Sequence, residues 1–513
     1  KAGTRAHFHT VEGGGHGTGF GGPELRSHVS EFFETHLKRN QIVSGPPTTT
    51  SSSPASSDQR QTGNSPAPRI TWQFVKRRED ANGDGVVTRE EFQGPRPLFA
   101  RLDRTKDNRL TADDFADMDS EQGTEDTRAL IASISKETLF RNRDGGGQTW
   151  FHPRACMVPD SDGTPVALMT LQEIGGSDYF GPVHWTMSKD LGKTWSPPEP
   201  IPALGRDPVP GRTDGLMAGV CDVTPQYHPQ TKTVLALGHV VFYKGEYFAR
   251  NEQLARYPVY VTRAADGQWS SRRILEWDDP RGAHIYSNNC GQRVVLPNGD
   301  VQMSFTFGPE ENGRMAAGVR STFDGHLLKI TEVGVPMHNP QGRGLLEPSV
   351  AQFNDQFWIT MRAEDNRGYV SVSSDGLNWD EKRAWCWDDG TPLETSTTQQ
   401  HWLTHSDGLF LVYTRKDPSN ENVIRWRSPL WVAQVDVEKR CLVRNTEQVV
   451  LPLMGDGINE PNQVALMGNF HVTNVSPMES WVTVGEWMPK DGYRGDVLLA
   501  RIRWSRPNRL PLW

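Results

Sequence analysis

One short segment limits the folds open to this chain more than any other. Ser188–Trp195 reads Ser-Lys-Asp-Leu-Gly-Lys-Thr-Trp. In this pattern the Asp carboxylate can cap a tight turn, the Gly can take a positive φ, and the Trp can fold back between neighbouring strands. Weaker copies of the pattern follow elsewhere, and a turn motif that recurs in this way indicates a fold built from repeated sheets.

The copies differ from the full motif, which is known as an Asp-box, in length and completeness. Asp144–Trp150 has one residue more between its Asp and Trp, and Ser373–Trp379 has one fewer. Asp266–Trp269 keeps only the core of the motif, and Asp324–Gly325 keeps the turn without its Trp. Each copy alone is also compatible with an ordinary hairpin turn, but together they favour a repeat.

Short alternating runs lie between these turns, as in Val166–Met169, Thr233–Leu237, Val301–Phe305 and Phe357–Met361. They are bounded by Gly, Asn, Asp and Pro, so they predict strands of about five residues. No comparable helical pattern follows residue 140. The sequence therefore predicts a mainly β chain, a β-propeller with four-stranded blades around a central channel.

Composition narrows the partners of the chain. Its 513 residues are expected to form two to four domains, and its net charge of −8 argues against nucleic acid as a partner. It has no apolar run of about 18 residues, so no membrane span is predicted. The five cysteines are scattered without paired spacing, which predicts buried small side chains rather than disulfides or a zinc site.

The first 68 residues predict two segments outside the propeller. Residues 1–42, with His16 in a Gly-rich stretch before the amphipathic Glu24–Lys38, resemble the C-terminal end of an α/β-hydrolase domain. The alternative is a Gly-rich loop before an amphipathic helix. The triad Ser and Asp are not present, so we expect a truncated remnant of an upstream hydrolase domain in a longer parent chain, without esterase activity. Residues 43–68 are rich in Ser, Thr and Pro and predict a flexible linker, which favours a secreted, extracellular or periplasmic protein.

An EF-hand calcium loop is predicted next, because its ligand positions match the motif. Oxygen ligands at positions one, three, five, seven and twelve would come from Asp80, Asn82, Asp84, the Val86 carbonyl and Glu91. A second loop in the same register offers Asp103, Thr105, Asp107, the Arg109 carbonyl and Asp114. It has Asn108 where the motif has Gly, so weaker occupancy is expected. Residues 69–120 are therefore predicted to be a small α-helical EF-hand pair that binds structural Ca²⁺.

From about residue 130 to 513 the chain resembles the sialidase-like superfamily, in which Asp-box (BNR) repeats mark a six-bladed propeller. The resemblance implies three arginines on a substrate carboxylate, an Asp acid/base and a Tyr nucleophile paired with a Glu. Arg154 and Asp178 precede the full motif at the places of the first arginine and the acid/base. Glu347 and Arg362 belong to two consecutive strand-like runs that resemble the strands carrying the Glu and the second arginine.

The third arginine and the nucleophile are not settled by the resemblance. Arg415, Arg425 and Arg427 compete for the third arginine, and Thr473–Trp481 contains no Tyr where a late-blade nucleophile is expected. Polar stretches elsewhere suggest additional sugar-binding or acid/base groups, which are Asp222, His239 and His401.

These residues predict a carbohydrate-active enzyme, an exo-acting glycoside hydrolase that releases an acidic or deoxy sugar from a glycan or polysaccharide. Asp178 and Glu347 would be its catalytic carboxylates, and arginines would bind the substrate acid because guanidinium groups pair with carboxylates in a bidentate way. Two alternatives stay open. One is a polysaccharide lyase acting on uronates, and the other is a non-catalytic glycan-binding propeller.

Overall fold

The computed structural model describes residues 129–513 continuously, together with parts of the stretch before them. Those parts are residues 75–76, 79–80, 84–92, 99, 102–103, 105–111 and 114. The predicted hydrolase-like segment 1–42, the linker 43–68 and the calcium ligand Asn82 lie outside the described residues. The chain divides into two compact units, with residues 129–513 in one and 32–128 as the other.

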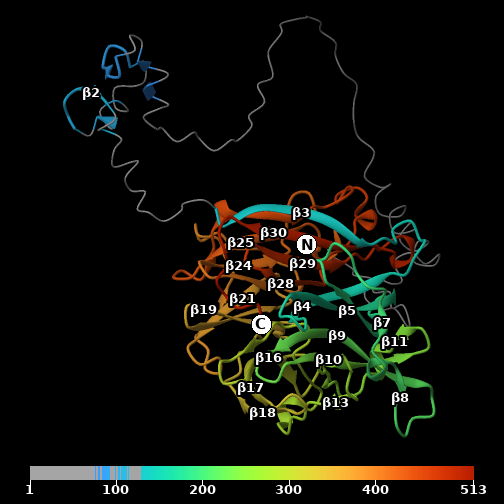
Figure 1. Cartoon of the computed structure of the whole chain (residues 1–513). Helices are drawn as coiled ribbons and strands as arrows, with labels where there is room; N and C mark the ends of the chain where they lie inside the picture. The colour runs from blue at the N-terminus through green and yellow to red at the C-terminus, as the bar shows by residue number, and fades with distance from the viewer. Residues whose placement is uncertain are drawn as a thin grey trace, which may run out of the picture. The chain divides into compact units, whose positions relative to one another are not determined.

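Residues 129–513 form a six-bladed β-propeller of antiparallel sheets that follow one another along the chain (Figure 1). The first blade contains β4 (Trp150–Pro159), β5 (Pro165–Gly176), β6 (Tyr179–Ser188) and β7 (Glu199–Pro200). The second contains β8 (Asp207–Pro208), β9 (Leu216–His228), β10 (Thr233–Lys244), β11 (Tyr247–Phe248), β12 (Pro258–Arg263) and β13 (Arg273–Ile274). The third contains β14 (Ile285–Ser287), β15 (Val294–Val295), β16 (Val301–Gly308), β17 (Met315–Phe323) and β18 (Leu328–Val333).

The remaining three blades repeat this arrangement. The fourth contains β19 (Leu346–Phe353), β20 (Gln356–Arg362), β21 (Gly368–Ser373) and β22 (Arg383–Ala384). The fifth contains β23 (His401–His405), β24 (Gly408–Tyr413), β25 (Leu430–Asp436), β26 (Cys441–Leu442) and β27 (Gln448–Leu451). The sixth contains β28 (Phe470–Ser476), β29 (Glu479–Gly485), β30 (Val497–Trp504) and β3 (Ile131–Phe140).

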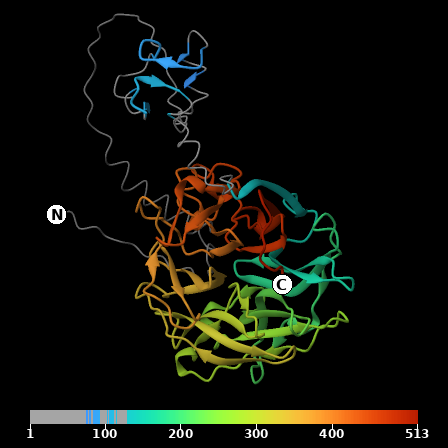
Figure 2. The same cartoon turned by 60° about the vertical axis from the view of Figure 1, so that its left-hand side comes forward.

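The sixth blade joins the two ends of the propeller. β3 pairs antiparallel with β30, with Ile131 opposite Trp504 and Phe140 opposite Val497 (Figures 1 and 2). The first strand of the propeller is thus the outer strand of its last blade. This pairing closes the ring with main-chain hydrogen bonds, so the propeller has no open seam between its first and last sheets.

The core of the propeller lies within and between the blades. Interior strands of the blades, such as β10 and β24, are buried on both faces, which explains their nearly continuous apolar sequences. Four of the largest fully buried side chains are tryptophans, namely Trp358, Trp385, Trp402 and Trp481. Each buried large apolar side chain stabilises the fold by roughly 1.5–3 kcal/mol, so the blades supply most of the stability.

The turn at Ser188–Trp195 fastens the first blade to the sixth. Asp190 accepts hydrogen bonds from the Ser188 hydroxyl (2.9 Å) and from the Thr194 hydroxyl (2.6 Å) and amide (2.9 Å). These bonds, mainly those from Thr194, lower the pKa of Asp190 to about 2. Trp195 lies against Trp481 of β29, with ring centroids 6.1 Å apart. The shorter copy at Ser373–Trp379 is capped in the same way, because Asp375 accepts from the Ser373 hydroxyl at 2.8 Å.

In the other unit, two short strands pair between the two predicted calcium loops. β1 (Val87–Thr88) and β2 (Arg109–Leu110) are antiparallel, with Val87 opposite Leu110. Each of these residues is position eight of its predicted loop, so the two loops lie in the same register. The helices expected around them fall largely outside the described residues, and the EF-hand pair stays a prediction.

Candidate functional site

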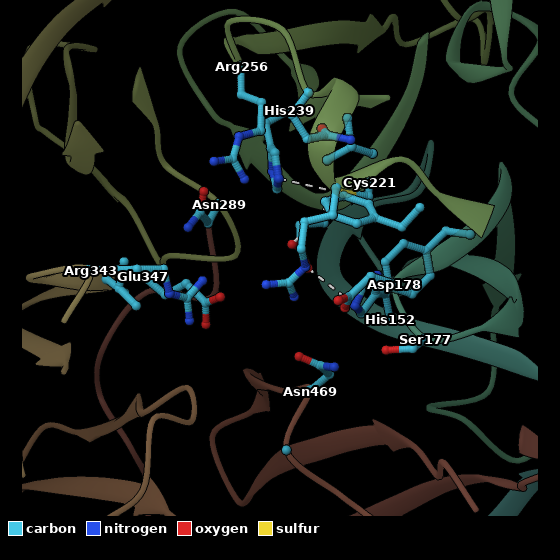
Figure 3. A pocket seen from close by; sticks show the side chains of 18 of the residues that line it. His152, Ser177, Asp178, Cys221, His239, Arg256, Asn289, Arg343, Glu347 and Asn469 are labelled. Carbon is cyan, nitrogen blue, oxygen red and sulfur yellow. Dashed lines mark hydrogen bonds and ion pairs between the residues drawn. The ribbon is translucent and has the colours of Figure 1, made fainter. Parts of the chain in front are cut away.

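A cavity of about 550 Å³ opens at the centre of the ring. Every blade, or a loop beside it, contributes to its lining, for example through His152, His239, Asn289, Glu347 and Asn469. Figure 3 shows Arg343 and Glu347 across the cavity from His152, Asp178 and Cys221. A site at this place can receive side chains from six separate sheets, which suits the recognition of a polar ligand from several sides.

Irregular backbone at the inner strands points polar side chains into the cavity. His152 in β4 (φ 51°) and Glu347 in β19 (φ 44°) lie where the strand register shifts. Asp222 in β9 (φ 55°) lies opposite a similar shift in β10. Bulges of this kind re-aim a side chain. Asp178, Asn289 and Arg425, which line the cavity outside these strands, also have a positive φ. A positive φ costs a non-glycine residue of the order of 1–3 kcal/mol, so six such residues around one cavity support its choice as the candidate functional site.

The lining carries more positive than negative charge. Its arginines are Arg250, Arg256, Arg314, Arg343, Arg362, Arg425 and Arg427, and its carboxylates are Asp178, Asp222, Glu311 and Glu347. Burial lowers the pKa of Arg314 and Arg425 to about 10 and that of Arg427 to about 9, which still leaves all three charged at neutral pH. The excess of guanidinium groups predicts an anionic ligand.

Ion pairs hold several of these arginines in place. Arg362 contacts Glu347 at 2.7 Å and donates to the Thr397 carbonyl at 2.9 Å. Two buried atoms of this pair, Arg362 Nε and Glu347 Oε2, have no hydrogen-bond partner among the described residues. Glu311 pairs with Arg256 (2.8 Å) and Arg314 (2.6 Å) on another side of the cavity. The pairs orient the guanidinium groups before a ligand arrives.

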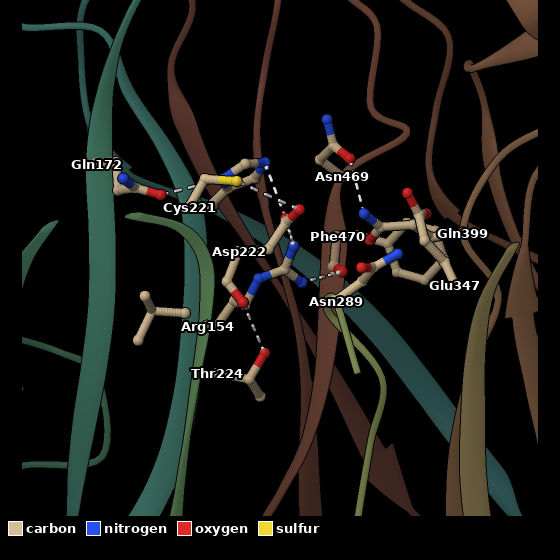
Figure 4. Close-up of polar contacts among 12 residues, drawn as sticks. Arg154, Gln172, Cys221, Asp222, Thr224, Asn289, Glu347, Gln399, Asn469 and Phe470 are labelled. Carbon is tan, nitrogen blue, oxygen red and sulfur yellow. Dashed lines mark hydrogen bonds and ion pairs between the residues drawn. The ribbon is translucent and has the colours of Figure 1, made fainter. Parts of the chain in front are cut away.

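Asp222 is the centre of a second network, between the first two blades. Arg154 Nη2 donates to Asp222 Oδ1 at 2.7 Å, and Arg154 also reaches the Phe470 carbonyl at 3.4 Å (Figure 4). His152 Nε2 lies 3.3 Å from the same carboxylate oxygen. Burial would raise the pKa of Asp222. In the acid range where this carboxyl titrates, however, His152 is protonated, and its charge together with that of Arg154 outweighs burial and holds the pKa of Asp222 below its usual range.

Two buried histidines face this network. Burial lowers the pKa values of His152 and His239 to about 4, so both imidazoles are neutral at pH 7. His239 Nε2 lies 3.4 Å from the Cys221 Sγ atom. Neutral imidazoles next to an arginine-rich cavity can accept protons from a bound ligand.

The cavity brings together seven of the residues that the sequence nominated. Two of them, Asp178 and Glu347, are the proposed catalytic carboxylates. The others are Asp222, His239, Arg362, Arg425 and Arg427. Asp178 lies in the exposed hairpin between β5 and β6, whereas Glu347 is held beside Arg362.

Three nominated residues do not line the cavity. Arg154 is wholly buried, and its guanidinium forms an ion pair with Asp222. Arg415 is held by both carboxylate oxygens of Glu447, at 2.8 Å each, and stacks on Trp431. His401 is also wholly buried, with its Nδ1 atom 3.3 Å from the Ser349 hydroxyl.

Sequence reasoning missed several lining residues, among them His152, Arg256, Arg314 and Arg343. The signal for His152 was its position two residues before Arg154, which is the spacing of neighbours on one strand face. No local pattern distinguishes the three arginines from surface arginines, because all three lie outside the strands. Arg256 and Arg314 are on connections within the second and third blades, and Arg343 is on the connection from the third blade to the fourth. No tyrosine is among the described residues that line it.

Comparison with protein-family models finds no match, and comparison with curated proteins finds none either. Solved structures do resemble the chain. A Hadza microbial sialidase shares 13% identity over 72% of this chain and 68% of its own, with a TM-score of 0.50. A protein of unknown function from Dyadobacter fermentans shares 14% over 73% of this chain and 100% of its own, also with a TM-score of 0.50.

A Trypanosoma rangeli sialidase shares 16% identity with the chain over 72% of this chain and 60% of its own, with a TM-score of 0.47. The match thus spans about three fifths of that protein. The fold is a sialidase-like propeller. At these identities the likeness describes the fold alone, and the chemistry has to be argued from the cavity. No helix in the described part of the chain has the length and apolar character to cross a membrane.

Proposed function

We propose that residues 129–513 form a carbohydrate-active enzyme of sialidase-like type, a glycoside hydrolase that releases an acidic or deoxy sugar from a glycan or polysaccharide. The observation that carries this proposal is the central cavity, which combines seven arginines with four carboxylates. The arginines favour a substrate that bears a carboxylate, and the carboxylates supply acid and base groups for cleavage of a glycosidic bond.

The proposed roles follow from the position of each group. Arg362 and Arg427 would bind the substrate carboxylate, with Arg425 beside them as the third candidate. Asp178, exposed on a hairpin at the cavity, would protonate the leaving oxygen as general acid. Glu347 would act as the partner carboxylate, since its Oε2 atom is buried and has no hydrogen-bond partner among the described residues.

A uronate-directed polysaccharide lyase is the second candidate, and one observation favours it. The lining has no tyrosine, but it has the two neutral imidazoles of His152 and His239. A neutral imidazole can take the proton next to a uronate carboxylate whose charge an arginine offsets. Lyase products carry a conjugated double bond that absorbs ultraviolet light, whereas hydrolase products do not.

The test is turnover of a panel of acidic glycans by the full chain and by Asp178→Asn and Glu347→Gln. Loss of a general acid costs roughly 10²–10⁴-fold in rate, so both variants should lose turnover while retaining glycan binding. Glu332→Gln, in β18 on the exposed surface, is the matched control and should leave turnover unchanged. New ultraviolet absorbance would favour the lyase. Binding without any turnover by the unsubstituted chain would leave a glycan-binding propeller and overturn the enzyme.

We also propose that residues 69–120 bind structural Ca²⁺. Support comes from the two loops, in which Gly85 donates to Asp80 (2.9 Å) and Asn108 donates to Asp103 (3.0 Å). One carboxylate oxygen from each of Asp103, Asp107 and Asp114 lies within 4.8 Å of the others. Calorimetric titration should show Ca²⁺ binding that Asp80→Ala weakens, and no heat in the unsubstituted chain would contradict the proposal. Export and an upstream hydrolase domain stay predictions.

A further inference from the structure

We propose that the cavity holds a divalent transition-metal ion, of which Zn²⁺ fits best, on Cys221, Asp222 and His239. This proposal goes beyond the proposed function, because it assigns a metal centre to a site described above only by its hydrogen bonds. The three residues come from the neighbouring strands β9 and β10, and all three line the cavity.

The distances suit one ion. One donor atom from each residue lies within 4.8 Å of the others. Cys221 Sγ lies 3.4 Å from His239 Nε2 and 4.0 Å from Asp222 Oδ2. Ligand atoms on a tetrahedral zinc ion, at bond lengths of about 2.0–2.3 Å, lie roughly 3.3–3.8 Å apart. The Cys221–His239 distance lies within that range, and the Cys221–Asp222 distance exceeds it by only a few tenths of an ångström.

The donor types select the metal. A thiolate, an imidazole and a carboxylate form a borderline-soft set that favours Zn²⁺ over Ca²⁺ or Mg²⁺, which prefer oxygen ligands alone. Cys binds a metal as the thiolate, so binding would release the proton of the Cys221 thiol to solvent.

The contacts of His152 show which oxygen of Asp222 is already occupied. Gln172 donates its amide hydrogens to the carbonyls of Gly181 (2.9 Å) and Val220 (2.7 Å). Its own carbonyl therefore faces His152 Nδ1, at 3.4 Å, and assigns a hydrogen to that nitrogen. The other ring nitrogen, His152 Nε2, lies 3.3 Å from Asp222 Oδ1.

Arg154 Nη2 also lies on Asp222 Oδ1, at 2.7 Å. The other carboxylate oxygen, Oδ2, lies on the side of Cys221 and is the one available to a metal. Three protein ligands leave a fourth position that faces the cavity, as in catalytic rather than structural zinc sites. A water molecule or a substrate oxygen would fill it.

Cobalt substitution of the full chain tests the proposal. After chelation and in saturating Ca²⁺, Co²⁺ should bind with one equivalent that gives near-ultraviolet thiolate-to-cobalt absorption, because the predicted calcium loops contain no thiol. Cys221→Ser should abolish this absorption and weaken Zn²⁺ binding at least tenfold. Cys441→Ser, a buried thiol on β26 of the fifth blade, is the matched control and should change neither.

Absence of the absorption from the unsubstituted chain, or its persistence in Cys221→Ser, would overturn the metal centre. His239→Gln provides a second variant if Cys221→Ser does not fold. X-ray absorption needs neither variant, because it uses the zinc-loaded unsubstituted chain. It should show one sulfur ligand, and a shell of oxygen and nitrogen alone would refute the site. None of these measurements requires glycan turnover, so they distinguish failure of the metal centre from failure of the proposed enzyme.

Discussion

Replacement of Arg154 by Met should destabilise the propeller by removing one half of a buried ion pair. Arg154 is wholly buried, its guanidinium lies 2.7 Å from Asp222, and the Asp222 side chain is itself only 13% exposed. Met fills much of the volume of Arg but leaves the carboxylate without its cation. Breaking a buried pair from one side costs roughly 3–5 kcal/mol in the free energy of unfolding.

That cost can be expressed as a melting temperature. Unfolding of about 385 residues carries an entropy change of roughly 0.8 kcal/mol per kelvin, so 3–5 kcal/mol corresponds to a shift of about 4–6 °C. Chemical denaturation followed by tryptophan fluorescence would measure the free energy directly, and the thermal shift would provide a second estimate. The denaturation curve and the thermal shift should both be measured at pH 7, where Asp222 is ionised.

A double-mutant cycle separates the pair from simple loss of packing. Asp222→Asn alone should also destabilise, because it leaves the Arg154 charge buried without its counterion. The double variant should cost at least about 1 kcal/mol less than the sum of the two single variants, as coupled neighbours do. Additive costs, or a loss below about 1 kcal/mol for Arg154→Met, would refute the role assigned to Arg154 beneath the cavity.

The pH dependence of the same pair has a defined sign. Because neighbouring charges depress the folded-state pKa of Asp222, the pair contributes stability fully above the unfolded-state pKa of about 3.9. That contribution is lost as the pH falls further, through the depressed pKa. The difference in stability between Arg154→Met and the unsubstituted chain should therefore shrink below about pH 4.

Two further predictions concern the turn and the buried histidines. Gly192→Ala should destabilise by about 1–3 kcal/mol, because the φ of Gly192 is +80° and a Cβ there would lie 2.9 Å from the Trp481 ring. Gly163→Ala is the control and should show only the smaller backbone cost, because Gly163 has a φ of +84° but no atom within 4 Å of an added Cβ. Equal denaturation midpoints for the two variants would contradict the fastening role. Burial lowers the pKa values of His152 and His239 from about 6.5 to about 4, so the stability that comes from their neutral forms is complete above pH 6.5 and falls towards pH 4. The loss should reach roughly 3 kcal/mol for each imidazole, measured as denaturation midpoints at pH 7, 5.5 and 4, and a flat profile would refute it.

The fold was predictable from the sequence because its signals are local. The Ser188–Trp195 motif and its copies mark the ends of strands, and alternation within each run sets which face is buried. The number of blades came from the resemblance rather than from counting, since several outer strands are only two residues long, such as β7, β13 and β22. Strands of that length leave no periodic signal.

The pairing of two site residues was predictable where both follow the strand pattern. Glu347 and Arg362 stand on two paired strands, and the structure indeed places them 2.7 Å apart. Arg154 is buried outside the lining, and the same pattern cannot distinguish a side chain that enters the cavity from one that lies below it. The register shift between Phe151 and Arg154 decides the matter, since it turns His152 towards the cavity and leaves Arg154 beneath it. A bulge of this kind has no sequence signature in a single chain.

His152 lines the cavity in the place where the sequence predicted Arg154, and this difference changes the chemistry that the first blade can offer. An arginine there would have been a fixed positive charge for a substrate carboxylate. A neutral imidazole next to Asp222, Cys221 and His239 can instead accept a proton, and the same group of atoms can hold a metal ion. Recognition of an anion then falls to arginines of later blades, including Arg362 and Arg427. Under the proposed function and the proposed metal centre, the cavity would have an anion-binding side and a proton- or metal-binding side, and the reacting bond of a substrate would lie between them.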